Sequence, residues 1–311
     1  MKSTWLTACV VAAVAILCLA QAKPDEPAEV PPPAADSLQG TEAGQVRDDN
    51  SLKMKLVWCP QGLVTMEDVE IVEDAPAKQW RRKIVPVKAV LSRGYWLGKY
   101  EVTQAEWKQV MGTEPWKGEK YAKEGDNCAV TFVSWHDATA FCEKLTEEEH
   151  KAGRLSDDWE FALPTEAEWE HGCRAGTETK FSFGDDASAL GEYAWFRNNA
   201  FDVERQYAHR VGQKKPNRWG LYDMHGNVWE WCLDAYQHKL PGGPDPVVKK
   251  IDAKGRVNRG GGWADFPTSC QSAKRSTNSP DIRGVDLGFR VALRLGSQAE
   301  PGADVRSTID K

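Results

Sequence analysis

One stretch constrains this chain more than any other: residues 220–231 read GLYDMHGNVWEW. Two carboxylates, Asp223 and Glu230, lie seven residues apart in it, with two glycines and several large aromatic side chains around them. Glycine allows backbone carbonyls to turn inward, and carboxylates with carbonyls are the ligands that a hard cation such as calcium prefers. The tryptophans would hold such a loop in place and exclude water. The stretch therefore predicts an ion-organised core that is rich in tryptophan.

The composition is that of a soluble globular protein. Of 311 residues, 28% are charged and 41% are hydrophobic. The net charge is −6 and no long basic run is present, which argues against nucleic acid or an anionic membrane as the main partner. Fourteen tryptophans are unusually many. Because each buried indole N–H needs a partner, they favour an irregular core with polar edges.

The first residues have the pattern of a secretory signal peptide, predicted over 1–22. Lys2 is followed by an apolar run at residues 6–19 and by the small-residue cleavage site at 20–22. The alternative of a membrane anchor is disfavoured because the run is shorter than the roughly 20 residues that span a bilayer. The mature chain then begins near Lys23, has no membrane span, and is secreted or periplasmic, where disulfides persist.

Two of the eight cysteines, Cys9 and Cys18, leave with the signal peptide. A lipoprotein is disfavoured because Leu17 stands before Cys18, where a small residue is expected. The other six are Cys59, Cys128, Cys142, Cys173, Cys232 and Cys270. None forms a Cys-x-x-Cys pair, so the sequence gives no support to a zinc ribbon or a thioredoxin-like site. Six cysteines allow up to three disulfides, and spacing alone does not fix their pairing.

Three segments follow the signal peptide. Residues 23–50 are rich in proline and acidic residues without periodicity, which predicts a disordered tether. Residues 51–296 contain no long break in composition and are predicted to form one domain. Residues 297–311 are predicted to be a flexible tail.

Short helices and strands are expected inside the domain. Capping boxes predict helices that begin at Thr103, Ser134 and Thr165. Four segments are expected to be extended: 56–58, 84–91, 95–97 and 289–291. The remainder is loop, dense in glycine, asparagine, aspartate and tryptophan. This pattern predicts an irregular, loop-rich α+β fold.

Besides residues 220–231, six motifs follow one another along the chain: GKYEVT at 98–103, VSWHDA at 133–138, LPTEAEWE at 163–170, CRAG at 173–176, RGG at 259–261 and LGFR at 287–290. Their order resembles the formylglycine-generating enzyme family, also called sulfatase-modifying factors. The resemblance covers roughly residues 52–293. It implies an α+β fold that is remotely similar to C-type lectins.

The family's founding activity, as the resemblance implies it, oxidises a cysteine of a partner sulfatase to formylglycine with molecular oxygen and copper(I). Active members carry two cysteines, five residues apart, after the Gly-Gly pair. In this chain Asp265 stands at the first position and Cys270 at the second. Copper(I) prefers two thiolates, and a carboxylate suits harder ions. The departure argues against a copper site and against the oxidase reaction.

Cys270 has two interpretations. In one, it remains a catalytic redox thiol or metal ligand. In the other, the resemblance implies a disulfide between Cys173 and Cys270, which would make Cys270 structural. A second family disulfide would join Cys142 to a cysteine after the LGFR motif, but Val291 stands there and the bridge is lost.

The resemblance also implies one calcium site. Asp223 and Glu230 would give side-chain oxygens, and Gly226 and Val228 would give backbone carbonyls. The alternative is that the two carboxylates only cap loop amides. The family's other calcium site begins at an asparagine, where this chain has Trp195, so the second site is predicted to be lost.

The remaining polar residues give weaker signals. The histidines His136, His171, His209 and His225 stand in no ligand spacing. The acids at 166, 168 and 170 fit a helix N-terminus for dipole reasons alone. No Ser-His-Asp arrangement, phosphate-binding loop or dinucleotide motif is visible.

Three classes of function compete. The sequence favours a secreted binding or accessory module with a structural calcium ion, which recognises a protein or glycan partner outside the cytoplasm. The alternative is a formylglycine-generating oxidoreductase that acts on a sulfatase with a different metal arrangement. A different metal-dependent oxidation on the same scaffold would need a ligand set that these histidines do not supply.

Overall fold

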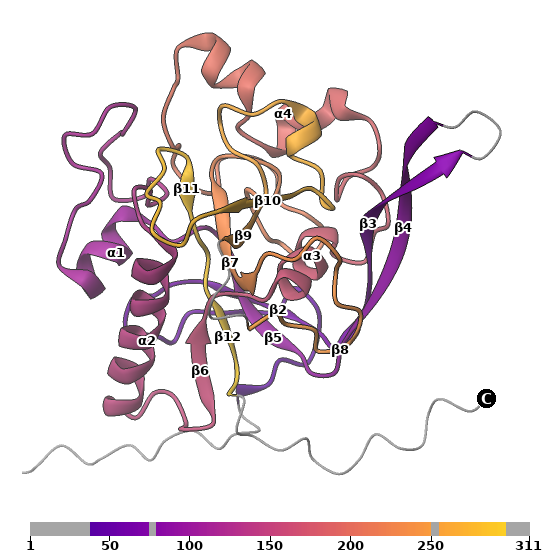
Figure 1. Ribbon diagram of the computed structural model, residues 1–311. Helices are drawn as coiled ribbons and strands as arrows, with labels where there is room; N and C mark the ends of the chain where they lie inside the picture. The colour runs from indigo at the N-terminus through magenta and orange to yellow at the C-terminus, as the bar shows by residue number, and fades with distance from the viewer. Residues whose placement is uncertain (1–37, 75–78, 250–254, 297–311) are drawn as a thin grey trace, which may run out of the picture. The chain divides into compact units, whose positions relative to one another are not determined.

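The computed structural model describes residues 38–74, 79–249 and 255–296. The predicted signal peptide and the predicted tail at 297–311 lie outside these residues. Within them, the fold is the irregular α+β architecture that the sequence predicts, with short helices and three small sheets joined by long ordered loops (Figure 1). In the part of the chain described, no helix has the length and apolar character needed to cross a membrane.

Three helices begin at the predicted capping boxes. They are α1 (Gln104–Met111), α2 (Trp135–Lys151) and α3 (Glu166–Arg174), and their N-cap residues are Thr103, Ser134 and Thr165. In each box the N-cap hydroxyl accepts from the N3 amide, and the N3 carboxylate accepts from the N-cap amide. A shorter α4 (Leu190–Tyr193) and four 3₁₀ turns complete the helical part: Ala187–Ala189, Arg197–Asn199, Phe201–Val203 and Pro267–Ser269.

The largest sheet has five antiparallel strands in the order β1-β2-β5-β12-β6. Their bounds are β1 (Val46–Arg47), β2 (Leu56–Cys59), β5 (Tyr95–Gly98), β12 (Ala292–Leu295) and β6 (Trp159–Ala162). The second sheet has the order β10-β9-β7-β11, and its strands are β10 (Arg275–Asn278), β9 (Arg256–Arg259), β7 (Trp229–Ala235) and β11 (Leu287–Gly288). The third sheet is β3 (Gly62–Asp74), β4 (Gln79–Leu91) and β8 (Gly243–Pro244).

Two expectations about boundaries are wrong. The domain begins before residue 51, because β1 pairs with β2 and the carbonyl of buried Leu38 accepts from the indole of Trp96. The predicted tether therefore extends too far, and only its residues up to 37 lie outside the described part. The segment 289–291 is not a strand: it carries the chain from β11 in one sheet to β12 in another.

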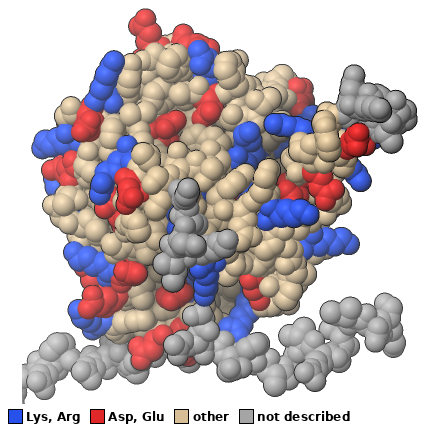
Figure 2. All heavy atoms as spheres, viewed as in Figure 1, with Lys and Arg blue, Asp and Glu red and all other residues tan. Residues whose placement is uncertain are grey.

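The core is organised by tryptophan, as the composition predicts. Trp107 stacks on Phe141, and Phe289 meets both rings edge-on. The indole N–H of Trp107 donates to Thr113, and that of Trp231 donates to the Val133 carbonyl. On the face of the described residues shown in Figure 2, positive and negative side chains alternate, and neither sign forms a broad patch.

Buried His171 gives the fold a testable pH dependence. It lies in α3 against Trp219 and Tyr95, and burial lowers its pKa from 6.5 to about 4. The unfolded chain therefore binds the proton more tightly, so the stability contributed by neutral His171 is complete above pH 6.5 and is lost as the pH falls toward 4.

We expect His171→Phe to reduce this dependence. Between pH 7 and pH 5 the free energy of unfolding of the wild type should fall by about 2 kcal/mol more than that of the variant. Urea unfolding at the two pH values measures the difference. Equal falls in the two proteins would show that His171 is not held neutral.

Candidate functional site

The loop at residues 220–231 is shaped by two non-glycine residues in the left-handed region and by one close approach. Asp223 and Asn227 have φ angles of 61° and 69°. Gly226 serves another purpose: a Cβ there would lie 2.3 Å from the carbonyl oxygen of Trp195, so only glycine allows the two segments to meet. The N–H of Asn227 donates to the same carbonyl at 2.7 Å. The loop is thereby fixed against the segment that contains Trp195.

Glu230 is completely buried and is bound on both oxygens. The Nε and Nη2 atoms of Arg290 donate to Oε2 and Oε1 at 2.6 and 2.7 Å, and the indole of Trp169 donates to Oε2 at 2.7 Å. Arg290, also buried, donates further to the carbonyls of Gly98 and Tyr222. This predicted calcium ligand is therefore neutralised by a protein cation.

Asp223 and Glu101 lie close together in the interior with incomplete partners. One oxygen of Asp223 accepts from the N–H of Gly212 at 2.7 Å, and one oxygen of Glu101 accepts from the amide of Asn227 at 3.0 Å. Asp223 Oδ1 and Glu101 Oε2 are buried without a hydrogen-bond partner. Burial raises the pKa of Asp223 to about 6, and burial together with the charge of Asp223 raises the pKa of Glu101.

Two buried carboxylates this close can share one proton, and a hard cation is the other group that would supply the missing countercharge. Because Glu230 already has Arg290, the geometry favours Asp223 with Glu101 over the predicted pair of Asp223 with Glu230. Glu101 is not among the predicted ligands. It lies in the GKYEVT motif, and no local pattern shows that this motif contacts the loop at 220–231, which is more than 100 residues away in the sequence.

Backbone atoms would have to complete such a site. Among the residues described, no group of three or more His, Cys, Asp or Glu side chains is placed to hold a metal. The predicted carbonyls of Gly226 and Val228 are the candidates for the other ligands. At the position of the second calcium site, which is predicted to be lost, the ammonium of Lys214 lies 4.0 Å from the centre of the Trp195 ring. The Trp195 side chain offers no oxygen there.

The residues at the position of the oxidase site do not fit copper(I). Asp265 Oδ2 accepts from the indole of Trp229 at 2.8 Å and from the N–H of Gly262 at 2.9 Å. The Cys270 thiol is completely buried, and burial followed by the charge of Asp265 raises its pKa. The carboxylate at the first thiol position is therefore already used to close a turn. It leaves Cys270 as a single protonated sulfur, where copper(I) prefers two thiolates.

Cys173 and Cys270 both contact His225. The Cys173 thiol lies 3.9 Å from Nε2, and Nδ1 donates to the Cys270 carbonyl at 2.8 Å. All six cysteines in the described residues are buried free thiols, Cys142 among them. No disulfide therefore joins Cys173 to Cys270 in the structure, and their pairing stays a prediction for the oxidised protein.

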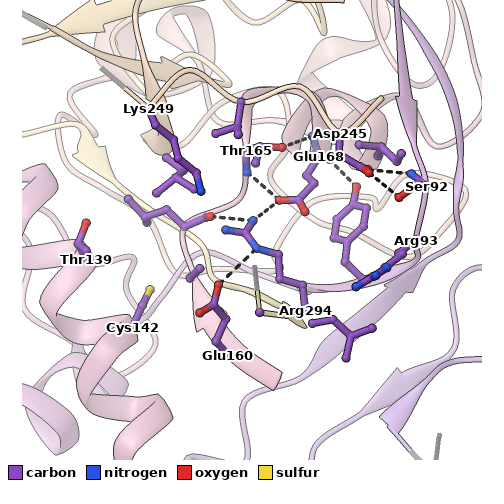
Figure 3. A pocket seen from close by; sticks show the side chains of 18 of the residues that line it. Ser92, Arg93, Thr139, Cys142, Glu160, Thr165, Glu168, Asp245, Lys249 and Arg294 are labelled. Carbon is purple, nitrogen blue, oxygen red and sulfur yellow. Dashed lines mark hydrogen bonds and ion pairs between the residues drawn. The ribbon is translucent and has the colours of Figure 1, made fainter. Parts of the chain in front are cut away.

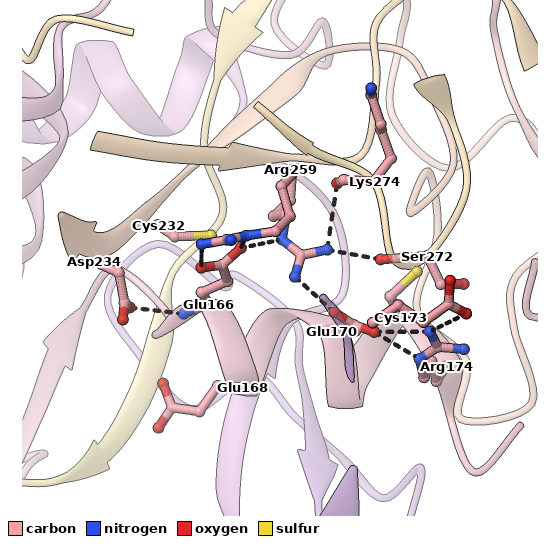
Figure 4. A network of polar contacts seen from close by, with 12 residues as sticks. Glu166, Glu168, Glu170, Cys173, Arg174, Cys232, Asp234, Arg259, Ser272 and Lys274 are labelled. Atoms are coloured by element: carbon pink, nitrogen blue, oxygen red, sulfur yellow. Dashed lines mark hydrogen bonds and ion pairs between the residues drawn. The ribbon is translucent and has the colours of Figure 1, made fainter. Parts of the chain in front are cut away.

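The acids of α3 form structural ion pairs (Figure 4). Arg259 is completely buried and donates to Glu166 at 2.9 Å and to Glu170 at 2.6 Å. Arg275 adds a second cation to Glu166, and Arg174 adds one to Glu170. These carboxylates are fully engaged, which leaves them no acid–base role.

The histidines do not converge on a common site. His136 is exposed beside Asp281, while His209 is buried and stacks on Trp195 with ring centroids 4.1 Å apart. His171 and His225 are buried in separate contacts.

A cleft of about 660 Å³ lies beside α2, β6 and β12 (Figure 3). Its wall contains leucine side chains. It also contains Arg256, whose guanidinium lies 3.9 Å from the centre of the Trp135 ring, and the ion pair between Arg294 and Glu168 at 2.6 Å. No residue of the segment 259–270 lines it. The cleft is therefore a cavity separate from the position of Asp265 and Cys270.

Comparison with protein families gives a match over most of the chain. The model described as "Sulfatase-modifying factor enzyme 1-like domain" matches residues 42–295. That start agrees with the ordered β1 rather than with the predicted boundary at 51.

Three relatives are informative. The chain is 27% identical to "Chaperone protein LppX" of Paenibacillus barcinonensis over 74% of this chain and 91% of that protein. It is 29% identical to "Formylglycine-generating enzyme" of Mus musculus over 76% of this chain and 74% of that protein. It is also 31% identical to "Inactive C-alpha-formylglycine-generating enzyme 2" of Mus musculus, over 64% and 58%.

Solved structures share the fold. "Treponema denticola variable protein 1" superposes with a TM-score of 0.60 and 30% identity, over 80% of this chain and 98% of that one. PvdO from Pseudomonas aeruginosa superposes with a TM-score of 0.67 and 23% identity, over 82% of this chain and all of that one.

The orphaned oxygens of Asp223 and Glu101 generate a test of the ion site. We expect a chelator to lower the melting temperature and calcium to restore it. At a thousandfold excess over Kd a bound ion stabilises the fold by about 4 kcal/mol, which corresponds to roughly 10 °C for a domain of this size. Differential scanning calorimetry with EDTA and then excess calcium measures the shift.

Asp223→Asn should abolish the calcium response. The matched control is Asp68→Asn. Asp68, on β3, is another buried carboxylate, but it accepts a hydrogen bond from the amide of Leu240. This control should respond as the wild type does. An unchanged melting temperature in EDTA would exclude the site.

Proposed function

The chain belongs to the sulfatase-modifying factor family, and from this premise we propose that it is a secreted binding or accessory module that does not generate formylglycine. The observation that supports the proposal is that the carboxylate of Asp265 already accepts two hydrogen bonds within the protein. Its carboxylate closes a turn with Gly262 and bonds the indole of Trp229, where an active member has the first copper thiol.

The chemistry of the remaining thiol supports the same proposal. Cys270 is buried among apolar side chains, and its pKa is raised, so it is protonated at neutral pH. A protonated thiol without a second sulfur binds copper(I) poorly. The chain keeps the family scaffold but lacks the pair of soft ligands on which the oxidation depends.

Two relatives have names that fit a role without oxidation: one is called a chaperone and another an inactive enzyme. In this proposal, calcium at Asp223 is a structural ion, and the partner is a protein or glycan outside the cytoplasm. The cleft beside α2 is the proposed place for a ligand, because leucine, guanidinium and carboxylate groups lie together in its wall. Such a wall suits a peptide segment that has both apolar and charged side chains.

The alternative function is a formylglycine-generating oxidoreductase that acts on a sulfatase cysteine with molecular oxygen. The named enzyme relatives and the retained Cys270 favour it. It would need metal ligands other than the thiol pair, and His225 binds the carbonyl of Cys270 through Nδ1 rather than its thiol.

A copper-binding assay tests the two functions. We expect the mature wild-type protein to take up no copper(I) in competition with a chromogenic chelator, and to leave a sulfatase-motif peptide unmodified. Asp265→Cys restores the two-thiol spacing and should gain one copper(I) ion per chain. The double variant Asp265→Cys/Cys270→Ser is the matched control and should lose that ion again.

Mass spectrometry of the peptide gives the second measurement. One tightly bound copper(I) ion in the wild type, together with conversion of the peptide thiol to an aldehyde, would overturn the proposal in favour of the oxidoreductase.

A further inference from the structure

The ribbon formed by β3 and β4 exposes large apolar side chains on one face, interspersed with charged ones. In its antiparallel register Leu63 lies opposite Val90, Val69 opposite Ile84, and Glu73 opposite Trp80. Residues that are directly opposite in a ladder point to the same side. Six large hydrophobic residues share this outer face, with exposures from 42% to 69%: Leu63, Val69, Ile71, Trp80, Ile84 and Val90. They are six of the eleven exposed large hydrophobic residues in the described part of the chain.

The inner face of the ribbon is already used. At its base Val64, Met66 and Ala89 are buried in a core cluster with residues of α3. The fold therefore gains nothing from apolar side chains on the outer face. Strands that are apolar on both faces are typical of sheets covered on both sides. In Figure 1 the outer part of the ribbon stands clear of the other described elements.

We propose that a second copy of this chain covers the outer face. In this dimer the outer faces of the two ribbons pack against each other, and the twofold axis runs between them, parallel to the strands. The strand β3 of each copy then lies over β4 of the other. Val69 then lies over Ile84 of the second copy, and Leu63 lies over Val90. The apolar residues of one ribbon meet apolar residues of the other at both positions.

The charges of the outer face are complementary under the same symmetry. The β3 side carries Glu67, which lies 3.7 Å from Arg174, and Glu73 toward the end of the ribbon, and the β4 side carries Arg82 and Lys88. Placing β3 over β4 brings Glu73 of one copy within reach of Arg82 of the other. An axis across the middle of the strands would instead place β4 over β4 in the reverse direction, with Arg82 of one copy over Lys88 of the other. Charge therefore selects the first of the two symmetric arrangements.

The size of the face fits a reversible dimer. Strands of thirteen residues extend about 40 Å, and two strands cover a width of about 10 Å. Each copy would bury on the order of 500 Å², and the total near 1,000 Å² lies at the lower limit for a specific interface. We expect association in the micromolar range.

Two other uses of the ribbon are disfavoured. Addition of a strand to β4 is disfavoured, because β8 already pairs with its end at Ala89 and Val90 and Pro86 has no N–H to give to a further ladder. Attraction to an anionic membrane is also disfavoured, since the acids of β3 offset the bases of β4. The inference does not depend on whether the chain oxidises a sulfatase.

Sedimentation equilibrium of the mature chain tests the proposal over about 1 to 200 µM. The wild type should shift from monomer to dimer, and Ile84→Glu on the outer face should remain monomeric, with at least a tenfold higher Kd. Val72→Glu is the matched control, because Val72 lies at the same end of the ribbon but on the inner face. It should dimerise as the wild type does. Thermal melting of all variants checks that the fold is kept.

Charge reversal tests the symmetry. Glu73→Arg and Arg82→Glu should each weaken the dimer, and the double reversal should restore it. A wild type that is monomeric at every concentration would overturn the proposal, as would equal loss in Val72→Glu. Binding of monomeric protein to phosphatidylglycerol vesicles, abolished by Ile84→Glu, would overturn it in favour of a membrane surface.

Discussion

The guanidinium of Arg290 is withdrawn completely from water, and the loop at 220–231 is arranged to satisfy it. Glu230 supplies the countercharge, and the carbonyls of Gly98 and Tyr222 accept the remaining N–H groups. Removing one partner of such a pair leaves an uncompensated buried charge, at a cost of roughly 3–5 kcal/mol. These contacts join the end of β5, the loop, β7 and the link between β11 and β12. The elements of two sheets are thereby held in one arrangement.

A second buried arginine repeats this design on the other side of Trp169. The indole N–H of Trp169 bonds Glu230, and the guanidinium of Arg259 lies 5.8 Å from its ring centre. Arg259 in turn binds Glu166 and Glu170 of α3. The tryptophan thus connects two ion-pair networks that are both closed to water. These two acids of the LPTEAEWE motif therefore stabilise the fold. Because arginines bind both carboxylates, neither is free to act as an acid or a base.

The sequence predicts those parts of the structure that depend on near neighbours. A capping box needs only four consecutive residues, and helices begin at Thr103, Ser134 and Thr165 as expected. The order of strands, the structured start at Leu38 and the buried meeting of Glu101 with Asp223 depend on contacts between distant segments. No local pattern contains that information. Of the β3–β4 ribbon the sequence predicts only the extended segment 84–91, because charged residues in both strands conceal the alternation of its apolar face.

These differences explain how the scaffold can lose a redox thiol and remain folded. Asp265 is not an orphaned acid in a site built for sulfur, since Trp229 and Gly262 satisfy one of its oxygens. It lies outside both arginine networks, so a change at this position does not disturb the interactions that hold the sheets together. The fold therefore constrains residue 265 much less than it constrains Glu230 or Glu166. A chain with these two networks intact can carry a different activity, or only a binding surface, on the same framework.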